Sequence, residues 1–211
     1  MDSIADGLES KCRYFPPRQF GATVINSRRN MKNTVILACS FLALVGCTTA
    51  APRKGSLDFS LLGDKKAAVF VFLAPDCPFS QNYTLTLNDL QAQFAADSVA
   101  FYGVVAGTGF RKAEIDEFAQ AYKIAFPVLP DRNFALADFF HAMKTPEAFV
   151  VNSRADLIYK GATDNWAADF GRHRRTITEH YLLDALNSWI RGDEVPIKET
   201  EAVGCFIERK G

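Results

Sequence analysis

From residue 67 onward, continuous apolar runs alternate with segments whose apolar positions recur at helical spacing. Residues 67–73 and 99–105 are runs rich in valine, which predicts strands buried on both faces. Between these runs, an amphipathic helix that begins close to Cys77 is predicted by the spacing of Tyr83, Leu87, Leu90 and Phe94. The order strand, helix, strand indicates the start of an α/β domain.

The same patterns continue to Gly192, where the last helix is expected to end. In chain order they predict a helix at 115–122, an extended piece at 126–129, a helix at 136–143, strands at 147–151 and 157–160, and a closing helix at 182–190. The two strands are joined by a turn and form a hairpin. Residues 57–63 are ambiguous and fit a short lead-in strand. Together the elements predict an α/β fold, a three-layer sandwich around a central mixed β-sheet.

Residues 31–46 have the pattern of an export signal. A basic start at Lys32 is followed by an apolar run of about a dozen residues, which is too short to span a membrane. The end of the run resembles the lipobox of bacterial lipoproteins, in which the following cysteine, here Cys47, is lipidated and becomes the first residue of the mature chain. Residues 47–56 then fit an unstructured tether. The alternative is that the run is a buried helix or strand.

Residues 1–30 precede this signal and show no apolar periodicity. We interpret them as a non-native extension, with Met31 as the true start. A twin-arginine leader is the alternative, because Arg28 and Arg29 stand before the apolar run. Under both interpretations the protein leaves the cytoplasm. A lipid on Cys47 would attach it to the membrane, facing the periplasm or the exterior.

Processing at Cys47 also simplifies the cysteine count. It removes Cys12 and Cys39 and leaves Cys77 and Cys205 as the two unmodified thiols in an oxidising compartment. We expect Cys77 in a folded domain of residues 57–192 and Cys205 in a C-terminal tail of residues 193–211. The net charge of zero argues against a nucleic-acid-binding protein, which would need a basic face, so no nucleic-acid partner is expected.

Two segments carry a family resemblance. Residues 72–80, FLAPDCPFS, resemble the active-site turn of thioredoxin-like proteins, and residues 145–150, TPEAFV, resemble their cis-proline segment. Together they are similar to the redoxin branch, which includes alkyl hydroperoxide reductase and thiol-specific antioxidant proteins. The resemblance covers residues 57–190, and residues 199–207 look like the ending of some secreted redoxins. It implies a thioredoxin-like fold in which Pro146 is cis and lies against the sulfur of Cys77. The exposed backbone of Thr145 would then bind an extended partner chain.

The departures from the family pattern limit the chemistry. Ser80 stands where a dithiol thioredoxin has its second cysteine. A peroxiredoxin has Thr or Ser three residues before the reactive cysteine and Pro seven before, but here these are Ala74 and Phe70. We therefore expect a thiol–disulfide oxidoreductase whose partners are protein thiols or disulfides. The alternatives are a thiol peroxidase, a copper-binding protein and a non-catalytic envelope protein.

Three residues of the active-site turn have expected roles. Cys77 should gain acidity from the helix start, which can lower a cysteine pKa to between ~3.5 and ~7.5. The alternative is an inert core cysteine. Pro78 fits the first helical turn, where an N–H is not needed. Ser80 could donate a hydrogen bond to the Cys77 thiolate or accept one from the backbone.

Cys205 could supply the resolving thiol that Ser80 cannot. The tail from Gly192 to Cys205 can span about 43 Å when extended, so it can return to the active-site end of the domain. The alternatives are a free tail thiol and a cysteine that pairs with another molecule.

A basic cluster at residues 172–175 lies in the loop predicted between the hairpin and the last helix. It could bind an acidic partner, lower the pKa of Cys77, or simply face solvent. The three histidines have no metal-ligand spacing, and Gln81 stands where copper-chaperone relatives have a second cysteine. A copper site of Cys77, Cys205 and a histidine is left as an alternative, and no metal or cofactor is expected.

Overall fold

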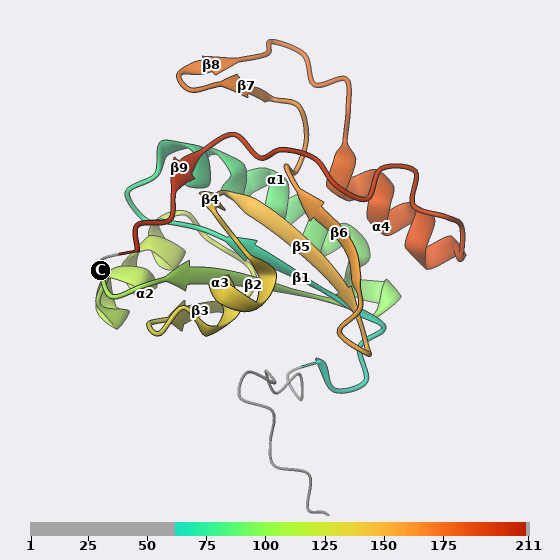
Figure 1. Cartoon of the computed structure of the whole chain (residues 1–211), viewed down its shortest axis with the longest axis horizontal. Coiled ribbons are helices and arrows are strands. Elements are labelled where there is room, and N and C mark those ends of the chain that lie inside the picture. The colour runs from blue at the N-terminus through green and yellow to red at the C-terminus, as the bar shows by residue number, and fades with distance from the viewer. Residues whose placement is uncertain (1–61, 210–211) are drawn as a thin grey trace, which may run out of the picture. The chain divides into compact units, whose positions relative to one another are not determined.

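The computed structural model describes residues 62–209, which fold around a five-stranded sheet in the order β3-β2-β1-β5-β6 (Figure 1). The strands are β1 (Ala67–Phe72), β2 (Val99–Ala106), β3 (Val128–Asp131), β5 (Glu147–Asn152) and β6 (Leu157–Gly161). β2 pairs parallel with β1 and with β3, whereas β5 is antiparallel to both β1 and β6. The sheet is therefore mixed, as predicted.

Helices cover both faces of this sheet. The helices are α1 (Pro78–Phe94), α2 (Lys112–Ala121), α3 (Ala135–Phe140) and α4 (Tyr181–Arg191), and a 3-10 turn, η2 (Ala95–Asp97), follows α1. Buried side chains of α1, α2 and α4 pack in one hydrophobic cluster against the sheet. Buried side chains of α3 belong to a second cluster. The predicted three-layer α/β sandwich around a central mixed sheet is confirmed.

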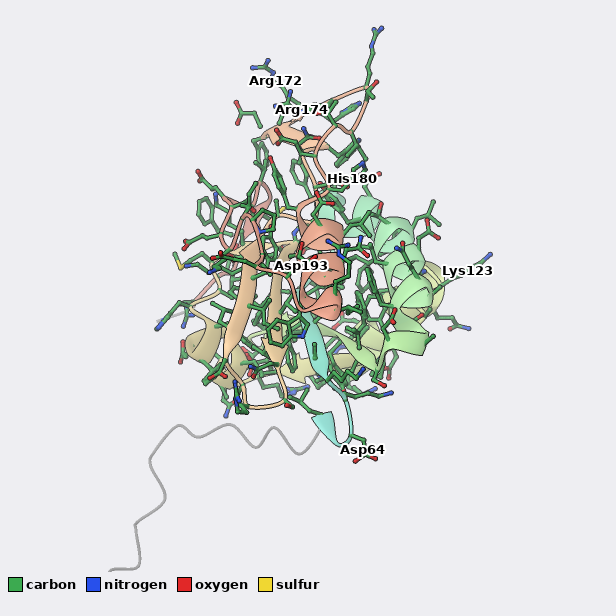
Figure 2. The ribbon with its side chains drawn as sticks, turned by 90° about the vertical axis from the view of Figure 1, so that its right-hand side faces the viewer. Asp64, Lys123, Arg172, Arg174, His180 and Asp193 are labelled. Atoms are coloured by element: carbon green, nitrogen blue, oxygen red, sulfur yellow. The ribbon has the colours of Figure 1, made fainter. Side chains whose placement is uncertain are left out.

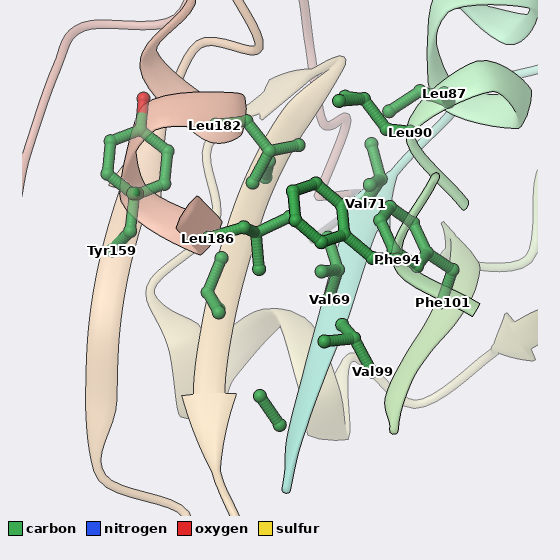
Figure 3. Packing of buried hydrophobic residues seen from close by; sticks show 14 of the residues in the cluster. Val69, Val71, Leu87, Leu90, Phe94, Val99, Phe101, Tyr159, Leu182 and Leu186 are labelled. Atoms are coloured by element: carbon green, nitrogen blue, oxygen red, sulfur yellow. The ribbon is translucent and has the colours of Figure 1, made fainter. Parts of the chain in front are cut away.

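The central strand β1 explains the continuous apolar run in the sequence. Every residue of β1 is buried, and successive side chains point to opposite faces. Val69 and Val71 enter the cluster formed with α1 and α4 (Figure 3). Phe70 enters the other cluster, where its ring lies 5.2 Å from that of Phe140 on α3. Burial of each such side chain is worth about 1.5–3 kcal/mol, so β1 holds both helical layers to the sheet.

The predicted helix at 136–143 is too long at its C-terminal end. α3 ends at Phe140, because His141 has a left-handed φ of 55° that stops the helix. Met143 is 57% exposed and Phe139 is 39% exposed, so neither belongs to a buried helical face. Of the lead-in strand expected at 57–63, the structure describes only Leu62 and Gly63, which form a turn.

Four very short strands were not predicted. β7 (Ala167–Asp169) and β8 (Arg172–His173) form a hairpin that projects from the domain (Figure 1), where the sequence suggested a plain loop. β4 (Lys144–Thr145) pairs antiparallel with β9 (Cys205–Phe206). Strands of two or three residues have no measurable alternation, so a hydrophobic pattern cannot predict them.

The C-terminal tail returns along the edge of the sheet. After Gly192 it passes β6, where the N–H of Lys160 donates to Lys198 O and the N–H of Thr200 donates to Lys160 O, each at 3.0 Å. It then crosses to β4 and becomes β9 (Figure 1). The tail therefore returns to the active-site end of the domain. The sequence had shown only that the tail is long enough to do so.

The predicted export features lie outside the described residues. These are the extension at 1–30, the signal at 31–46, Cys47 with the tether at 47–56, and the two cysteines Cys12 and Cys39. Within residues 62–209, no helix is both long enough and apolar enough to cross a membrane.

Candidate active site at Cys77 and Cys205

Cys77 stands at the point where β1 has ended and α1 begins. It is the N-cap residue of α1, with extended backbone angles of φ −86° and ψ 114°, and Pro78 follows in the first turn. The carbonyl of Cys77 accepts the first helical hydrogen bond, from the N–H of Gln81 at 3.0 Å. The sulfur is thus placed beside the unpaired N–H groups of a helix start, as the sequence predicted.

The sulfur of Cys77 is covered by the segment that precedes Pro146. The Cys77 thiol donates a hydrogen bond to the Thr145 carbonyl oxygen at 3.1 Å, and the Thr145–Pro146 peptide bond is cis. Cys77 is only 1% exposed. The backbone of Thr145, expected from the resemblance to be exposed for a partner, is instead paired with the chain's own tail.

The tail brings Cys205 to the same place. In the pairing of β4 with β9, Cys205 lies directly opposite Thr145, and the Thr145 hydroxyl donates to the Cys205 carbonyl oxygen at 3.4 Å. Both the thiol and the backbone N–H of Cys205 are within hydrogen-bonding reach of the Cys77 sulfur. Both cysteines are free thiols. The structure therefore brings Cys77, Thr145 and Cys205 together from three distant parts of the chain.

The pKa of the Cys77 thiol is lowered from its ordinary value of 9.0. Burial alone raises it, but four hydrogen bonds to the thiolate together outweigh burial. They come from the thiol and the backbone N–H of Cys205, the backbone N–H of Ser80 and the side chain of Thr145. Hydrogen bonds to the charged form favour that form, so neutral donors acidify this cysteine.

The pKa of the Cys205 thiol moves the other way, from 9.0 to about 12. Burial is the largest cause, and the hydrogen bond to Cys77 and the negative charges of Cys77 and Asp76 add to it. When both cysteines are reduced, Cys77 is therefore the first of the two thiols to ionise as the pH rises, and Cys205 keeps its proton. These opposite pKa shifts suit Cys77 as the nucleophile and Cys205 as a second thiol that reacts later.

Ser80 supports the turn with its side chain and the sulfur with its backbone. Its fully buried hydroxyl accepts a hydrogen bond from the N–H of Ala74 at 3.1 Å. Of the two roles predicted for the hydroxyl, this is the structural one. The hydrogen bond from Ser80 to the thiolate comes from its N–H.

The basic cluster lies on the projecting hairpin and next to it. Residues 172–175 are exposed, and Figure 2 shows Arg172 and Arg174 at the far end of the molecule from Asp64. After burial, which raises the pKa of Cys77, the causes that lower it are neutral hydrogen-bond donors rather than these arginines. The cluster is thus a solvated surface in this arrangement.

Aromatic contacts attach this hairpin to the active-site helix, which the sequence did not suggest. Phe79, two residues after Cys77, lies 5.8 Å from Phe170 and 6.4 Å from Trp166 between ring centroids. Trp166 also stacks on His173 at 5.3 Å. The signal available in the sequence was the spacing of Trp166 and Phe170 in a segment otherwise rich in charge.

A cleft of about 400 Å³ opens beside the tail. It is lined by Asp76, Thr145 and Cys205 together with apolar side chains that include Phe110 and Phe134, whereas Cys77 does not line it. For the copper alternative, the described part of the chain holds no group of three or more His, Cys, Asp or Glu side chains placed to bind a metal ion.

Comparison with known proteins finds one matching family and solved structures with a similar fold. The model of the AhpC/TSA family matches residues 47–160. A conserved protein of Geobacillus kaustophilus is 21% identical, with a TM-score of 0.61 over 69% of this chain and 78% of the other. A hypothetical protein of Sinorhizobium meliloti 1021 is 20% identical, with a TM-score of 0.63 over 72% and 84%. These two similarities show the fold alone. No curated protein matches the sequence.

Proposed function

Because the chain belongs to the AhpC/TSA family, which supports an oxidoreductase in general, we propose that it is a thiol–disulfide oxidoreductase acting through the Cys77 thiolate, with Cys205 as the resolving thiol. The observation that carries this proposal is the pairing of Thr145 with Cys205. It holds two free thiols side by side, one with a lowered pKa and one with a raised pKa.

In the first step the Cys77 thiolate attacks one sulfur of a partner disulfide. A bond forms between Cys77 and that sulfur, and the partner's second sulfur leaves as a thiolate that takes up a proton. Because the thiolate rather than the thiol is the nucleophile, the lowered pKa of Cys77 raises the reactive fraction at neutral pH.

In the second step Cys205 releases the partner. Its thiolate attacks the sulfur of Cys77, the Cys77–Cys205 disulfide forms, and the partner's first sulfur leaves as a second thiol. The partner gains two electrons and the protein loses two. A thiol reductant then restores the two cysteines of this chain, and the same steps run backwards oxidise a dithiol partner.

The pKa of Cys205 depends on the state of Cys77, and this dependence sets the order of the two steps. Two of the causes that raise it, the hydrogen bond to Cys77 and the charge of Cys77, exist only while Cys77 is a free thiolate. Once Cys77 is bonded to a partner sulfur, both causes vanish and the pKa of Cys205 falls. Cys205 therefore becomes a better nucleophile at the stage that needs it.

Peroxide reduction is supported less well. Ala74 and Phe70 occupy the places where a peroxiredoxin carries its hydroxyl residue and its proline. Both are apolar, and Phe70 is part of the core beneath the sheet. The residues of this turn instead support attack on a sulfur held against the Thr145 segment.

The proposed setting is the cell envelope, with the chain anchored through a lipid on Cys47 and acting on protein thiols or disulfides. The apolar run before Cys47 and the tether after it support export. An oxidising compartment is also where protein disulfides persist as substrates.

The test is exchange with a peptide that contains one disulfide. Reduced protein should release two peptide thiols per molecule and then contain a Cys77–Cys205 disulfide, found by mass mapping without reductant. Cys77→Ser should release none, and Cys205→Ser should stop at a covalent adduct on Cys77. Release by Cys205→Ser at the parent rate would exclude Cys205 as the resolving thiol. Consumption of hydrogen peroxide in preference to the disulfide would favour the peroxidase alternative.

A further inference from the structure

The tail is bound along β4 as an added strand. Beyond the pairing of Thr145 with Cys205, the N–H of Ile207 donates to the carbonyl of Met143 at 2.9 Å. The ammonium group of Lys144 donates to the carbonyl of Ala202 at 2.8 Å, and Ala202 is buried. Three consecutive residues, Met143 to Thr145, thus bind a tail segment of six residues, 202–207, of which Cys205 and Phe206 form the strand.

Gly204 lies close against the backbone of Thr145 on β4. A Cβ atom added to Gly204 would lie 2.1 Å from the Thr145 carbonyl oxygen and 2.7 Å from the Thr145 carbonyl carbon. Both atoms are backbone atoms of a paired strand, so they cannot move aside as a flexible side chain could. The requirement for glycine here is one of space, since the φ of Gly204 lies outside the left-handed region.

The docked tail covers the nucleophile. Cys77 is 1% exposed, and its sulfur contacts both Thr145 and Cys205. The cleft beside the tail reaches Cys205 but not Cys77. A disulfide partner of any size therefore has no path to the Cys77 sulfur while the tail is docked.

We infer that Gly204 is a positioning residue that lets the tail and an extended disulfide partner occupy the Lys144–Thr145 edge in turn. This inference rests on the proposed thiol–disulfide exchange. The partner displaces the tail, pairs with the same backbone and forms the mixed disulfide with Cys77. The Cys205 donors leave with the tail, whereas the backbone N–H of Ser80 stays beside the thiolate. The tail then docks again, which only glycine at position 204 permits, and delivers Cys205 to the Cys77 sulfur. Strand addition at an open edge is a general way to bind an extended peptide.

The first test measures how well Cys77 is covered. Alkylation of Cys77 by iodoacetamide is followed over a pH series by peptide mass mapping, and the plateau rate at high pH reports access to the thiolate. In a Cys205→Ser background, Gly204→Ala should raise that plateau about tenfold, because the tail no longer stays docked. Gly109→Ala is the matched control, since an added Cβ there meets nothing within 4 Å. An unchanged plateau in Gly204→Ala overturns the inference.

The second test measures delivery of Cys205. A mixed disulfide is formed on Cys77 with a small aromatic thiol, and its release is timed. With Cys205 present, Gly204→Ala should slow release about tenfold, and Gly109→Ala should release at the parent rate. Release by Gly204→Ala at the parent rate contradicts the inference.

A second variant guards against a folding defect. Ile207→Pro removes the N–H that donates to Met143 and leaves Gly204 and both thiols in place, so it should change both rates in the same directions by a smaller factor. If Gly204→Ala does not fold, the two rates measured in Ile207→Pro test the inference in its place. The two proposals can fail separately, because the alkylation plateau requires no exchange reaction. If Gly204→Ala raises the alkylation plateau but Cys77 forms no adduct with any disulfide, the proposed function is refuted. The conclusion that the docked tail covers Cys77 would still hold.

Discussion

Cys77 and Cys205 are the same side chain at nearly the same place, yet their pKa values move in opposite directions. Burial raises the pKa of both. Cys77 sits at a helix start with backbone and side-chain donors around its sulfur, whereas Cys205 faces the negative charges of Cys77 and Asp76. The comparison teaches that the groups facing a buried thiol, more than the extent of its burial, decide which of two cysteines is the nucleophile.

The largest expected effect is the separation of the two titrations. Alkylation against pH, mapped peptide by peptide, should give a midpoint below 9.0 for Cys77 and a midpoint near 12 for Cys205. In Cys77→Ser the midpoint of Cys205 should fall below 12, because the hydrogen bond to Cys77 and its charge are gone. Two midpoints that both lie at 9.0 would mean that the two thiols do not influence each other.

The second effect is on stability in alkaline solution. The pKa of Cys205 is raised in the folded state, so its contribution to stability is fully present below 9.0 and is lost as the pH rises through about 12. Cys77 has the opposite sign. Its folded pKa is lowered, so its contribution is present above the unfolded pKa and is lost as the pH falls through the folded value.

Urea unfolding of the reduced protein at a series of pH values measures both contributions. Between pH 9.0 and 12 the free energy of unfolding should fall less in Cys205→Ser than in the parent. As the pH falls, the difference in free energy of unfolding between the parent and Cys77→Ser should shrink. A parallel pH dependence in all three proteins would contradict the assignment of charge to Cys77.

A third, smaller effect separates the two roles of Cys205. Both Cys205→Ser and Cys205→Ala remove the resolving thiol, but only serine keeps a side-chain donor for the Cys77 thiolate. We therefore expect the pKa of Cys77 to rise in Cys205→Ala and to change less in Cys205→Ser. The alkylation midpoint of Cys77 measures this. Equal midpoints in the two variants would show that the Cys205 side chain does not stabilise the thiolate.

The smallest effect concerns the anchor of the tail on β6. The Thr200 hydroxyl accepts from the N–H of Ala162 at 2.9 Å and shares a hydrogen bond with the Tyr159 hydroxyl at 2.6 Å. Thr200→Val should weaken the anchor by about 1 kcal/mol and slow formation of the Cys77–Cys205 disulfide about fivefold. Thr176→Val, at an exposed loop position, is the control and should form the disulfide at the parent rate. A parent rate in Thr200→Val as well would show that this anchor does not help to position Cys205.

The sheet and its helices were predictable because each carries its own local signal. β1 and β2 are apolar runs, α1 shows a helical spacing, and Gly192 marks the end of α4 with a φ of 77°. α3 was predicted too long, because Phe139 and Met143 have the right spacing but the backbone at His141 ends the helix. Side-chain spacing does not show where a backbone turns left-handed.

The site divides in the same way. The position of Cys77 at a helix start follows from the strand before it and the helical spacing after it. The place of Cys205 depends on pairing with a residue 60 positions away, and the tail carries no periodicity that encodes it. The sequence supplied only the reach of the tail and the presence of a thiol on it. The close approach of Gly204 to Thr145 became visible only in three dimensions.

The tail along β6 also bears on how this molecule avoids aggregation. A sheet has two outer strands whose free N–H and C=O groups can recruit other chains. Here β3 carries Pro130, which has no N–H to offer, and β6 is bridged by the tail through Lys198 and Thr200. Proteolytic loss of the tail would therefore do more than remove a thiol. It would open one border of the sheet, and clipped molecules would tend to join edge to edge into oligomers.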